Sequence, residues 1–204
     1  MKHLKWLIPV FIIAFCFLGF LIAPNDPEAM DIVNKYAAPS VDFPLGTDQF
    51  GRCELSRLLY GGKVTLGIVL LGGSIVLVLG TLIGLWLGQA NAAKSLAFSS
   101  LLDAVTAIPP LAYLIIFVGI WGNSIPTMLV ALTVSLILRM IKLVKTQTEL
   151  ELDKAYVLCA VSSGASRSRV LFVHILPNII RPLVHFLCLS CAEMIMNISA
   201  FSFI

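Results

Sequence analysis

The sequence is poor in charged residues. Asp, Glu, Lys and Arg make up 12% of its 204 residues, whereas a typical soluble domain contains about 25%. Hydrophobic residues reach 59%, and the mean hydropathy is +0.98. This composition excludes an ordinary soluble domain and favours a multi-span membrane protein. The net charge of +3 is not gathered into a basic patch interleaved with aromatic residues, so no nucleic-acid partner is expected.

Motifs that would carry catalysis are also absent. The sequence has no G-x-x-x-x-G-K-[ST], and the nearest approach, Gly62-Lys63, lacks the upstream glycine and the following hydroxyl residue. A loop that holds ATP phosphates needs those features, so we expect no ATP-binding site and no bound cofactor in this chain. Neither H-E-x-x-H nor G-x-S-x-G occurs. No catalytic residue is therefore assigned, and an enzyme is not expected.

The five cysteines lack the paired spacing of a disulfide framework or of a metal site. Cys188 and Cys191 form a C-x-x-C, but it falls in a hydrophobic segment and has no second pair. A redox or zinc site there is one reading, and small apolar packing residues are the favoured one. No metal ligand is assigned.

Hydrophobic segments dominate the rest of the chain. Five of them approach the ~20 residues that a helix needs to cross a bilayer. The first is expected to be retained, because Leu21 stands where a cleavage site ending at Ala23 would need a small residue. The segments predict an all-α integral membrane bundle. Its expected parts are an N-terminal transmembrane helix at 1–23, an extracytoplasmic loop with an interfacial helix at 24–63, and a core at 64–204 with spans at about 64–87, 101–121, 125–144 and 179–204.

Two local patterns lie inside these spans. Gly80-x-x-x-Gly84 has the spacing that lets helices approach closely, although glycine is common in membrane helices for other reasons. Pro109-Pro110 is expected to kink the third span, because proline lacks the amide donor.

Lysine and arginine indicate the orientation. With the N-terminus inside, ten of these residues fall in inside segments and four in outside loops. Inside segments of membrane proteins carry the excess of positive charge, so we expect a cytoplasmic N-terminus and a cytoplasmic loop at 146–178.

That cytoplasmic loop contains a long, water-compatible stretch at 155–177. Thr148 with Glu151 forms a capping-box pattern that could start a helix. Ser163-Gly164-Ala165-Ser166 would end it, since glycine allows a tight bend and Ser166 can cap a second helix, which Pro177 would halt. Helical spacing places four residues on one face of the first helix: Leu150, Val157, Leu158 and Val161.

The stretch resembles the EAA loop of bacterial ABC importer permeases, whose pattern is E-A-A, three residues, G, nine residues, then I-x-L-P. Leu158-Cys159-Ala160 occupy the first slots, Gly164 the glycine, and His174-Ile175-Leu176-Pro177 the end; the leading acid and one alanine are lost. Together with Tyr156-Val157, it looks like the dipeptide/oligopeptide/nickel branch. The resemblance implies a coupling helix that docks in a cleft of an ATPase subunit. The implied coupling residues are Tyr156, Ala160, Gly164, Ala165, Ser166, His174, Leu176 and Pro177.

Residues 45–61 resemble a second segment of the same branch, L-G-T-D-x-x-G-R-D-x-x-S-R-L-x-x-G, and depart from it at Cys53. Thr47 or Asp48 could cap a helix here, whose membrane-facing side would carry Leu55, Leu58 and Leu59. Its arginines would face headgroups, a partner permease or a binding protein, and a solvated helix without a partner is the alternative. The signature residues are Gly46, Thr47, Asp48, Gly51, Arg52, Ser56 and Arg57.

Together the two resemblances imply a multi-pass permease subunit in the bacterial cytoplasmic membrane, surrounded by lipid. It would import nickel, other metal chelates, or di- and oligopeptides. The implied partners are a second homologous permease, two ATPase subunits that hold the ATP, and an extracytoplasmic solute-binding protein. Members of this family continue past the position of Ile204 to one more span, so five spans are expected here, with the family's last span missing.

Polar residues within the spans are candidates for a solute pathway. His185, Glu193 and Asn197 share one helical face of the last span. They could line the pathway and meet a cation or a peptide amine, or they could hydrogen-bond to a partner subunit. Asp103, at the inner end of the third span, is expected to be structural.

Two rival functions stay open at this stage. One is an ion-coupled transporter or channel that uses Glu193 and needs no ATPase. The other, less favoured, is an intramembrane hydrolase that uses Ser190 and His185, although five residues along a helix is a poor spacing for a nucleophile and its base.

Overall fold

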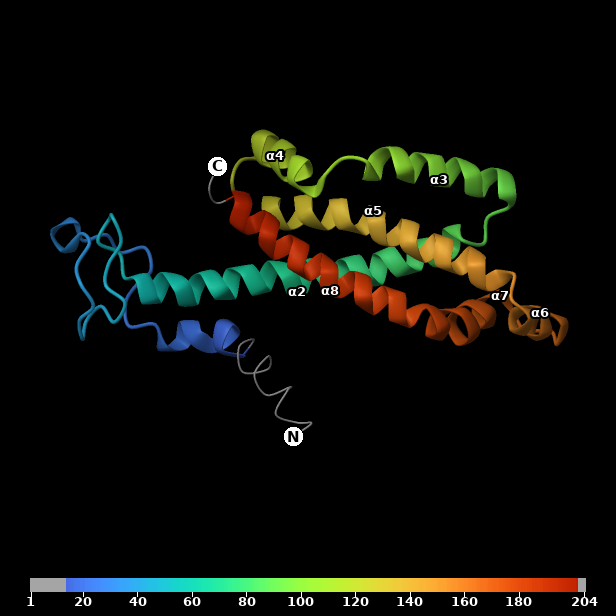
Figure 1. Ribbon diagram of the computed structural model, residues 1–204, viewed down its shortest axis with the longest axis horizontal. Coiled ribbons are helices and arrows are strands. Elements are labelled where there is room, and N and C mark those ends of the chain that lie inside the picture. Colours follow the sequence, from blue (N-terminus) through green and yellow to red (C-terminus); the bar gives the residue numbers. More distant parts are fainter. Residues whose placement is uncertain (1–13, 202–204) are drawn as a thin grey trace. The chain divides into compact units, whose positions relative to one another are not determined.

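Helices account for all the regular secondary structure in the described part of the chain, which is residues 14–201 of a computed structural model (Figure 1). The expected all-α class is therefore confirmed. The chain divides into two compact units, residues 1–67 and 68–204, and each unit is described by itself.

The first unit is mostly an irregular loop. Residues 14–18 are helical and are followed by the 3-10 turn η1 (Gly19–Ile22). A second 3-10 turn, η2 (Ile32–Asn34), lies within the loop, and α2 (Glu54–Leu87) begins at its end. Residues 1–13 of the expected first span, 1–23, lie outside the described residues.

The structure corrects one expectation in this unit. Residues 54–63 do not form a separate interfacial helix; they are the first turns of the long helix α2. No proline interrupts α2, so its hydrogen bonds continue without a break. Thr47 and Asp48 lie in the loop before the helix and do not cap it.

The second unit is a bundle organised around α5 (Ile125–Leu152). Helices α3 (Ala92–Thr106), α4 (Pro110–Trp121), α6 (Ala155–Ser162) and α8 (Leu176–Phe201) all pack against it. Between α6 and α8 lie α7 (Arg167–Arg169) and the π-helical segment η3 (Val170–Ile175). The core of this unit contains fully buried apolar residues from three helices, among them Val76, Leu132, Val144 and Met194.

Glycines bring α2 against α5. A Cβ atom added to either of two glycines on α2, or to Gly88 directly after it, would lie 2.5 to 2.6 Å from a side chain of α5, which is closer than van der Waals contact. The three glycines recur every four residues, and so do the α5 residues that face them, so each set lies on one face of its helix. The spacing of Gly80 and Gly84 is therefore used for close helix packing. The facing pairs are Gly80–Met140, Gly84–Val144 and Gly88–Thr148.

Three helical runs are long and apolar enough to cross a membrane: α2, α5, and the continuous run over residues 167–201. Helices α3 and α4 make a fourth if they count as one span. They are bent by 71° at Ala107–Pro109, so the expected third span at 101–121 is not a single helix. The two prolines remove amide donors and disfavour helical backbone before them, which turns the expected kink into a break.

Two other boundaries differ from expectation. The fourth span was expected to end near residue 144, but α5 continues to Leu152. Thr148 and Glu151 are thus interior residues of α5 and do not start a new helix. The last helical run begins at Arg167, twelve residues before the expected 179.

Candidate functional site: the connection between α5 and α8

A C-terminal cap ends α6 and fixes the bend that follows it. The N–H of Ala165 donates to the carbonyl of Ala160 at 3.0 Å, and the N–H of Gly164 donates to that of Val161 at 2.9 Å. This pair of bonds is the Schellman motif, which satisfies the last carbonyls of a helix. It needs left-handed backbone at Gly164, whose φ is +81°. The expected glycine stop after the first short helix is therefore present.

Ser166 starts the next helix, as its position predicted. Its Oγ accepts a hydrogen bond from the Arg169 N–H at 3.4 Å. Helix α6 is thus bounded by a glycine cap, and the following helical run by a serine cap.

Pro177 does not end that run. In η3 the N–H of Leu176 donates to the carbonyl of Leu171, the wide spacing of a π-helix. A wide turn leaves room for a proline ring and for the carbonyl that the proline cannot bond. The Asn178 amide donates to the carbonyl of His174 at 2.7 Å. The expectation that Pro177 halts the helix is therefore wrong.

Tyr156 fastens α6 to the end of α5. The buried Glu151 carboxylate accepts hydrogen bonds from the Tyr156 hydroxyl at 2.5 Å and from Lys154 Nζ at 2.6 Å. Burial raises the pKa of Tyr156, and the bond to the Glu151 carboxylate raises it further. The phenol therefore keeps its proton and remains a donor.

The apolar residues of this connection do not share one face. Val157 is 1% exposed and belongs to the core, whereas Leu158 and Val161 are each more than half exposed. Leu150 lies on α5 and is also exposed. The expected single face is therefore wrong, because the tight turn at Asp153–Lys154 breaks the helical register between Leu150 and α6. The result is an α6 with one buried anchor and an exposed apolar side.

The other coupling candidates differ in exposure. Ala160, Ala165, His174 and Leu176 are half-buried. Gly164, Ser166 and Pro177 are exposed.

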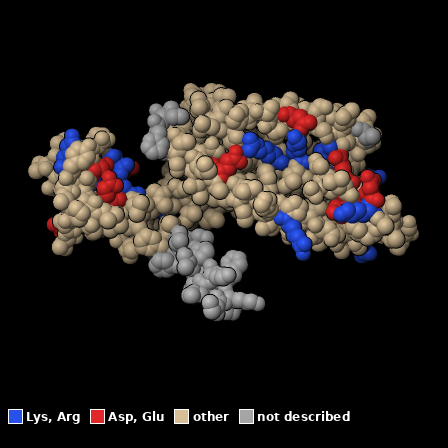
Figure 2. Space-filling model, viewed as in Figure 1, with Lys and Arg blue, Asp and Glu red and all other residues tan. Residues whose placement is uncertain are grey.

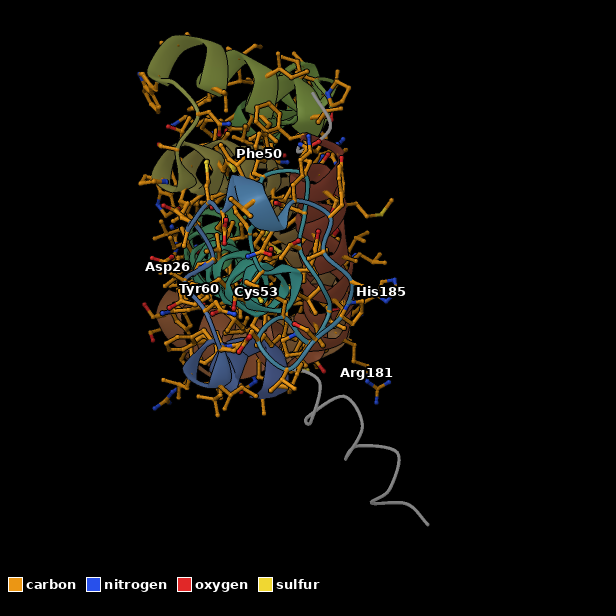
Figure 3. The ribbon with its side chains drawn as sticks, turned by 90° about the vertical axis from the view of Figure 1, so that its left-hand side faces the viewer. Asp26, Phe50, Cys53, Tyr60, Arg181 and His185 are labelled. Carbon is orange, nitrogen blue, oxygen red and sulfur yellow. The ribbon has the colours of Figure 1, made fainter. Side chains whose placement is uncertain are left out.

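The candidate pathway residues all lie on α8, and their surroundings differ. Glu193 is bound by Arg139 of α5, with Nη1 3.0 Å from Oε1 and 3.2 Å from Oε2. The Asn197 amide donates to the backbone carbonyl of Glu193 at 2.9 Å. The His185 side chain is exposed and extends outward from the ribbon (Figure 3). No group of three or more His, Cys, Asp or Glu among residues 14–201 is placed to hold a metal ion.

Arg139 is the partner that sequence reasoning missed. A charged residue inside a span needs a partner on another helix, and Arg139 and Glu193 both fall inside spans, so this rule could have paired them.

Two further lysines of α5 bind α3. Lys142 Nζ lies 2.5 Å from Asp103 Oδ1 on the surface, which gives Asp103 a structural contact. Lys145 is 1% exposed, and its Nζ donates to Ser95, Ser99 and Glu149 at 2.8 Å each. Basic and acidic side chains accordingly lie side by side on the face seen in Figure 2, with uncharged surface around them.

The signature loop of the first unit is built from its own signature residues. Asp48 accepts hydrogen bonds from the N–H groups of Phe50 and Arg52 and from Arg52 Nε, and Arg57 Nη1 lies 3.5 Å from its carboxylate. Thr47 Oγ1 accepts from the Ala37 N–H at 2.8 Å.

Three more signature residues of the first unit are buried. Gly51 has φ +75°, and a Cβ there would lie 1.6 Å from the Asp31 carbonyl oxygen. Gly46, with φ +78°, sits 2.5 Å from the Ala37 carbonyl by the same measure. Ser56 is fully buried, and its Oγ accepts from the Asn25 N–H at 3.1 Å. Each of these residue types therefore has a structural role within the first unit. The expectation that Leu55, Leu58 and Leu59 share a membrane-facing side is wrong, because Leu59 is 2% exposed and Leu58 is 62% exposed.

The geometry of α8 does not support the hydrolase alternative. Ser190 is 2% exposed in the core, whereas His185 is exposed on the helix surface. A nucleophile and its base must lie within hydrogen-bond reach, and these two side chains are on different sides of the helix.

Comparison with known proteins decides the family. Residues 80–204 match the family described as the binding-protein-dependent transport system inner membrane component. The chain belongs to this family. As an inner membrane component with several helices of membrane-spanning length, it is a multi-pass membrane protein. The resemblance to peptide-branch ABC importer permeases is likewise confirmed by its relatives.

Three relatives of this inner membrane component show the degree of similarity. The peptide transport system permease protein SapC of Salmonella typhimurium strain LT2 is 34% identical over 199 residues, 93% of this chain and 66% of that protein. The di/tripeptide transport system permease protein DppC of Pseudomonas aeruginosa is 30% identical over 200 residues, 95% of this chain and 66% of that protein. A putative peptide transport system permease protein of Brucella abortus biovar 1 is 31% identical over 212 residues, 100% of this chain and 70% of that protein. The chain spans 66% of the length of the SapC and DppC relatives.

Proposed function

We propose that this chain is a permease subunit of an ATP-driven importer of peptides, and that α6 couples it to separate ATPase subunits. The observation that carries the proposal is α6 itself: a short helix with a buried anchor, a rigid glycine cap and an exposed apolar side, placed between two membrane-length helices of a family member.

The exposed side of α6 supports docking. Leu158 and Val161 lie on a connection outside the spans, where water or another protein must cover them. An amphipathic helix laid into a groove buries its apolar face and gains affinity from it. The Glu151–Tyr156 bond and the Schellman cap hold α6 in one orientation on α5, so force applied to α6 reaches the bundle.

The partners and location follow from the same proposal. ATP is held by two ATPase subunits, since this sequence lacks a phosphate-binding loop. A second permease and an extracytoplasmic binding protein complete the importer. The excess of Lys and Arg in the expected inside segments supports a cytoplasmic N-terminus and a cytoplasmic α6.

Peptides are the substrate class that we propose ahead of nickel or a metal chelate. The names of the three relatives above refer to peptide or di/tripeptide transport. Glu193, the carboxylate once considered for a cation, is already bound by Arg139. Whether His185, Glu193 and Asn197 line the pathway stays a prediction.

Native cysteines offer a sharp test. Cys159 is exposed on α6, and Cys188 is exposed on α8. We would make two single-cysteine forms of the full chain and crosslink them in membranes that contain the whole importer. The Cys159 form should crosslink to a protein with G-x-x-x-x-G-K-[ST], and the Cys188 form should not. If neither cysteine reaches such a protein, ATPase coupling through α6 is excluded.

Transport is tested separately. Cells that carry the importer should take up labelled dipeptide or oligopeptide, and unlabelled peptide should compete while Ni²⁺ should not. Uptake of ⁶³Ni that is insensitive to peptide would replace the peptide assignment with the nickel one.

A further inference from the structure

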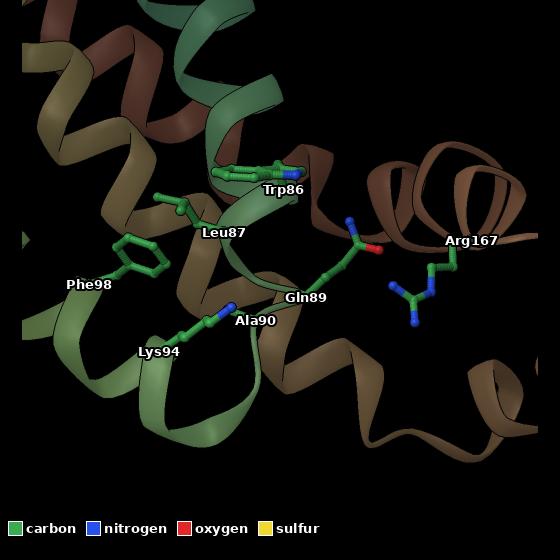
Figure 4. Close-up of a pocket in the computed structure, with 7 residues that line it drawn as sticks. All are labelled: Trp86, Leu87, Gln89, Ala90, Lys94, Phe98 and Arg167. Carbon is green, nitrogen blue, oxygen red and sulfur yellow. The ribbon is translucent and has the colours of Figure 1, made fainter.

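A cleft of about 610 Å³ lies where α2 ends and α3 begins (Figure 4). One part of its wall is apolar, with Trp86, Leu87 and Phe98. The other part carries Gln89, Lys94 and Arg167. The cleft therefore combines an apolar wall with two long basic side chains.

Both basic residues of the cleft are exposed. The ion pairs found among residues 14–201 involve neither Lys94 nor Arg167. No acidic residue lines the cleft. The site thus has two positive charges to offer to an anion from outside the chain.

A separate apolar groove of about 320 Å³ lies between α2 and the last helical run. Val78 and Leu82 of α2 form one of its sides, and Phe172, Ile180 and Val184 line the other. Thr81 is its one polar lining residue. The groove lies farther from the end of α2 than the cleft does, toward the middle of the span.

The groove and the cleft share a helix face. Val78, Leu82 and Trp86 recur every four residues, so they form one stripe on α2. On the opposite wall, Phe172 of the groove follows Arg167 of the cleft within one helical run. One elongated molecule can therefore occupy both, with its polar end at Lys94 and Arg167.

We propose that the cleft and groove bind one anionic phospholipid, whose phosphate lies between Lys94 and Arg167 and whose acyl chain follows the Val78–Leu82 stripe. Basic pockets between membrane helices bind anionic headgroups. An exposed Trp at the end of a span occupies the headgroup level of the bilayer, and Trp86 is 69% exposed one residue before the end of α2. The proposal needs only that α2 spans the membrane and does not depend on ATPase coupling.

The test uses the full chain, purified in detergent and stripped of lipid. Native mass spectrometry would measure binding of phosphatidylglycerol and of phosphatidylcholine with the same acyl chains. Phosphatidylglycerol should bind more tightly, and Lys94→Gln and Arg167→Gln should each weaken it about fivefold. Arg169→Gln is the matched control, because Arg169 is exposed two residues from Arg167 but does not line the cleft; it should change binding less than twofold.

A second variant tests the groove. Val78→Trp would fill it without touching a basic residue, and it should weaken both lipids alike. Inorganic phosphate, which has no acyl chain, should not displace phosphatidylglycerol.

Three results would overturn the proposal. Equal binding of phosphatidylglycerol to the Lys94→Gln, Arg167→Gln and unmodified proteins removes the headgroup site. Displacement by equimolar inorganic phosphate makes it a free-anion site. Variants that keep the lipid but lose co-purifying ATPase would make the cleft part of a protein interface.

Discussion

Arg139 of α5 and Glu193 of α8 form an ion pair, with Arg139 Nη1 3.0 Å from Glu193 Oε1. Each belongs to a helix of membrane-spanning length. A charged group within a span has a high free-energy cost unless it faces a partner or water, so each residue lowers that cost for the other. The pair holds α8 to α5, and any solute contact with Glu193 would have to compete with Arg139.

Breaking this pair on one side should destabilise the bundle. We expect Arg139→Leu or Glu193→Leu to lower the free energy of unfolding by about 1–3 kcal/mol, because the remaining charge loses its partner. The double variant should lose less than the sum of the two. Thermal unfolding in detergent, followed by circular dichroism, measures this cycle, and strict additivity would show that the two residues do not interact.

The glycine face of α2 gives a second prediction. Gly84→Ala should destabilise the bundle by about 1–3 kcal/mol, because its Cβ would lie 2.5 Å from Val144 Cβ. Gly67→Ala on the same helix is the control, since no atom lies within 4 Å of its added Cβ. Alanine is the better helix former by up to about 1 kcal/mol, so the control should be neutral or stabilising. Equal melting temperatures for the two variants would contradict the packing of α2 on α5.

Substitutions at Gly164 in the cap of α6 should be harmful through backbone conformation and not through the size of the new side chain. Space around Gly164 is open, but its φ of +81° disfavours other residues, by about 1–2 kcal/mol for alanine. We expect Gly164→Ala to reduce peptide uptake per ATP hydrolysed while the chain still inserts, and Gly164→Asn to do less harm because asparagine tolerates this conformation. Uptake and ATPase rates in proteoliposomes measure the ratio. An unchanged ratio in Gly164→Ala would exclude a coupling role for the cap.

Asp48 predicts how the loop of the first unit responds to pH. Burial raises the pKa of its carboxyl, but the N–H groups of Arg52 and Phe50 and the Arg52 guanidinium outweigh this, so the pKa lies below the ordinary value. A lowered pKa in the folded state adds stability above the unfolded value, about 3.9, and this stability is lost as the pH falls through the folded pKa.

Asp48→Asn should therefore lower the melting temperature between pH 5 and 7, where Asp48 is ionised. The difference from the unmodified chain should shrink below about pH 3.9 and vanish at lower pH. Melting curves of both proteins across this range test the sign. A difference that grows on acidification would contradict the hydrogen bonds assigned to the carboxylate.

Much of the fold could be predicted from local sequence. The hydrophobic runs predicted α2, α5 and the last helix, because the ~20 apolar residues that a membrane-spanning helix needs can be counted in the local sequence. Gly164 and Ser166 marked the bend after α6 because caps depend on a few neighbouring residues. Helix ends were predicted less well, since α5 passes Thr148 and the last helix passes Pro177. In one case α5 continued through a local start signal, and in the other a π turn accommodated a local stop signal.

The amino-acid sequence by itself determined the membrane class, the absence of a phosphate-binding loop motif and the glycine-capped bend. All three depend on composition or on residues close together in the chain. Only the tertiary structure decided which charges meet: Arg139 with Glu193, Lys145 with Ser95 and Ser99, and the exposed Lys94 and Arg167 around one cleft. The partners in these contacts lie 46 or more residues apart, so the contacts exist only once the glycines of α2 and the break at Pro109 have set how the helices pack.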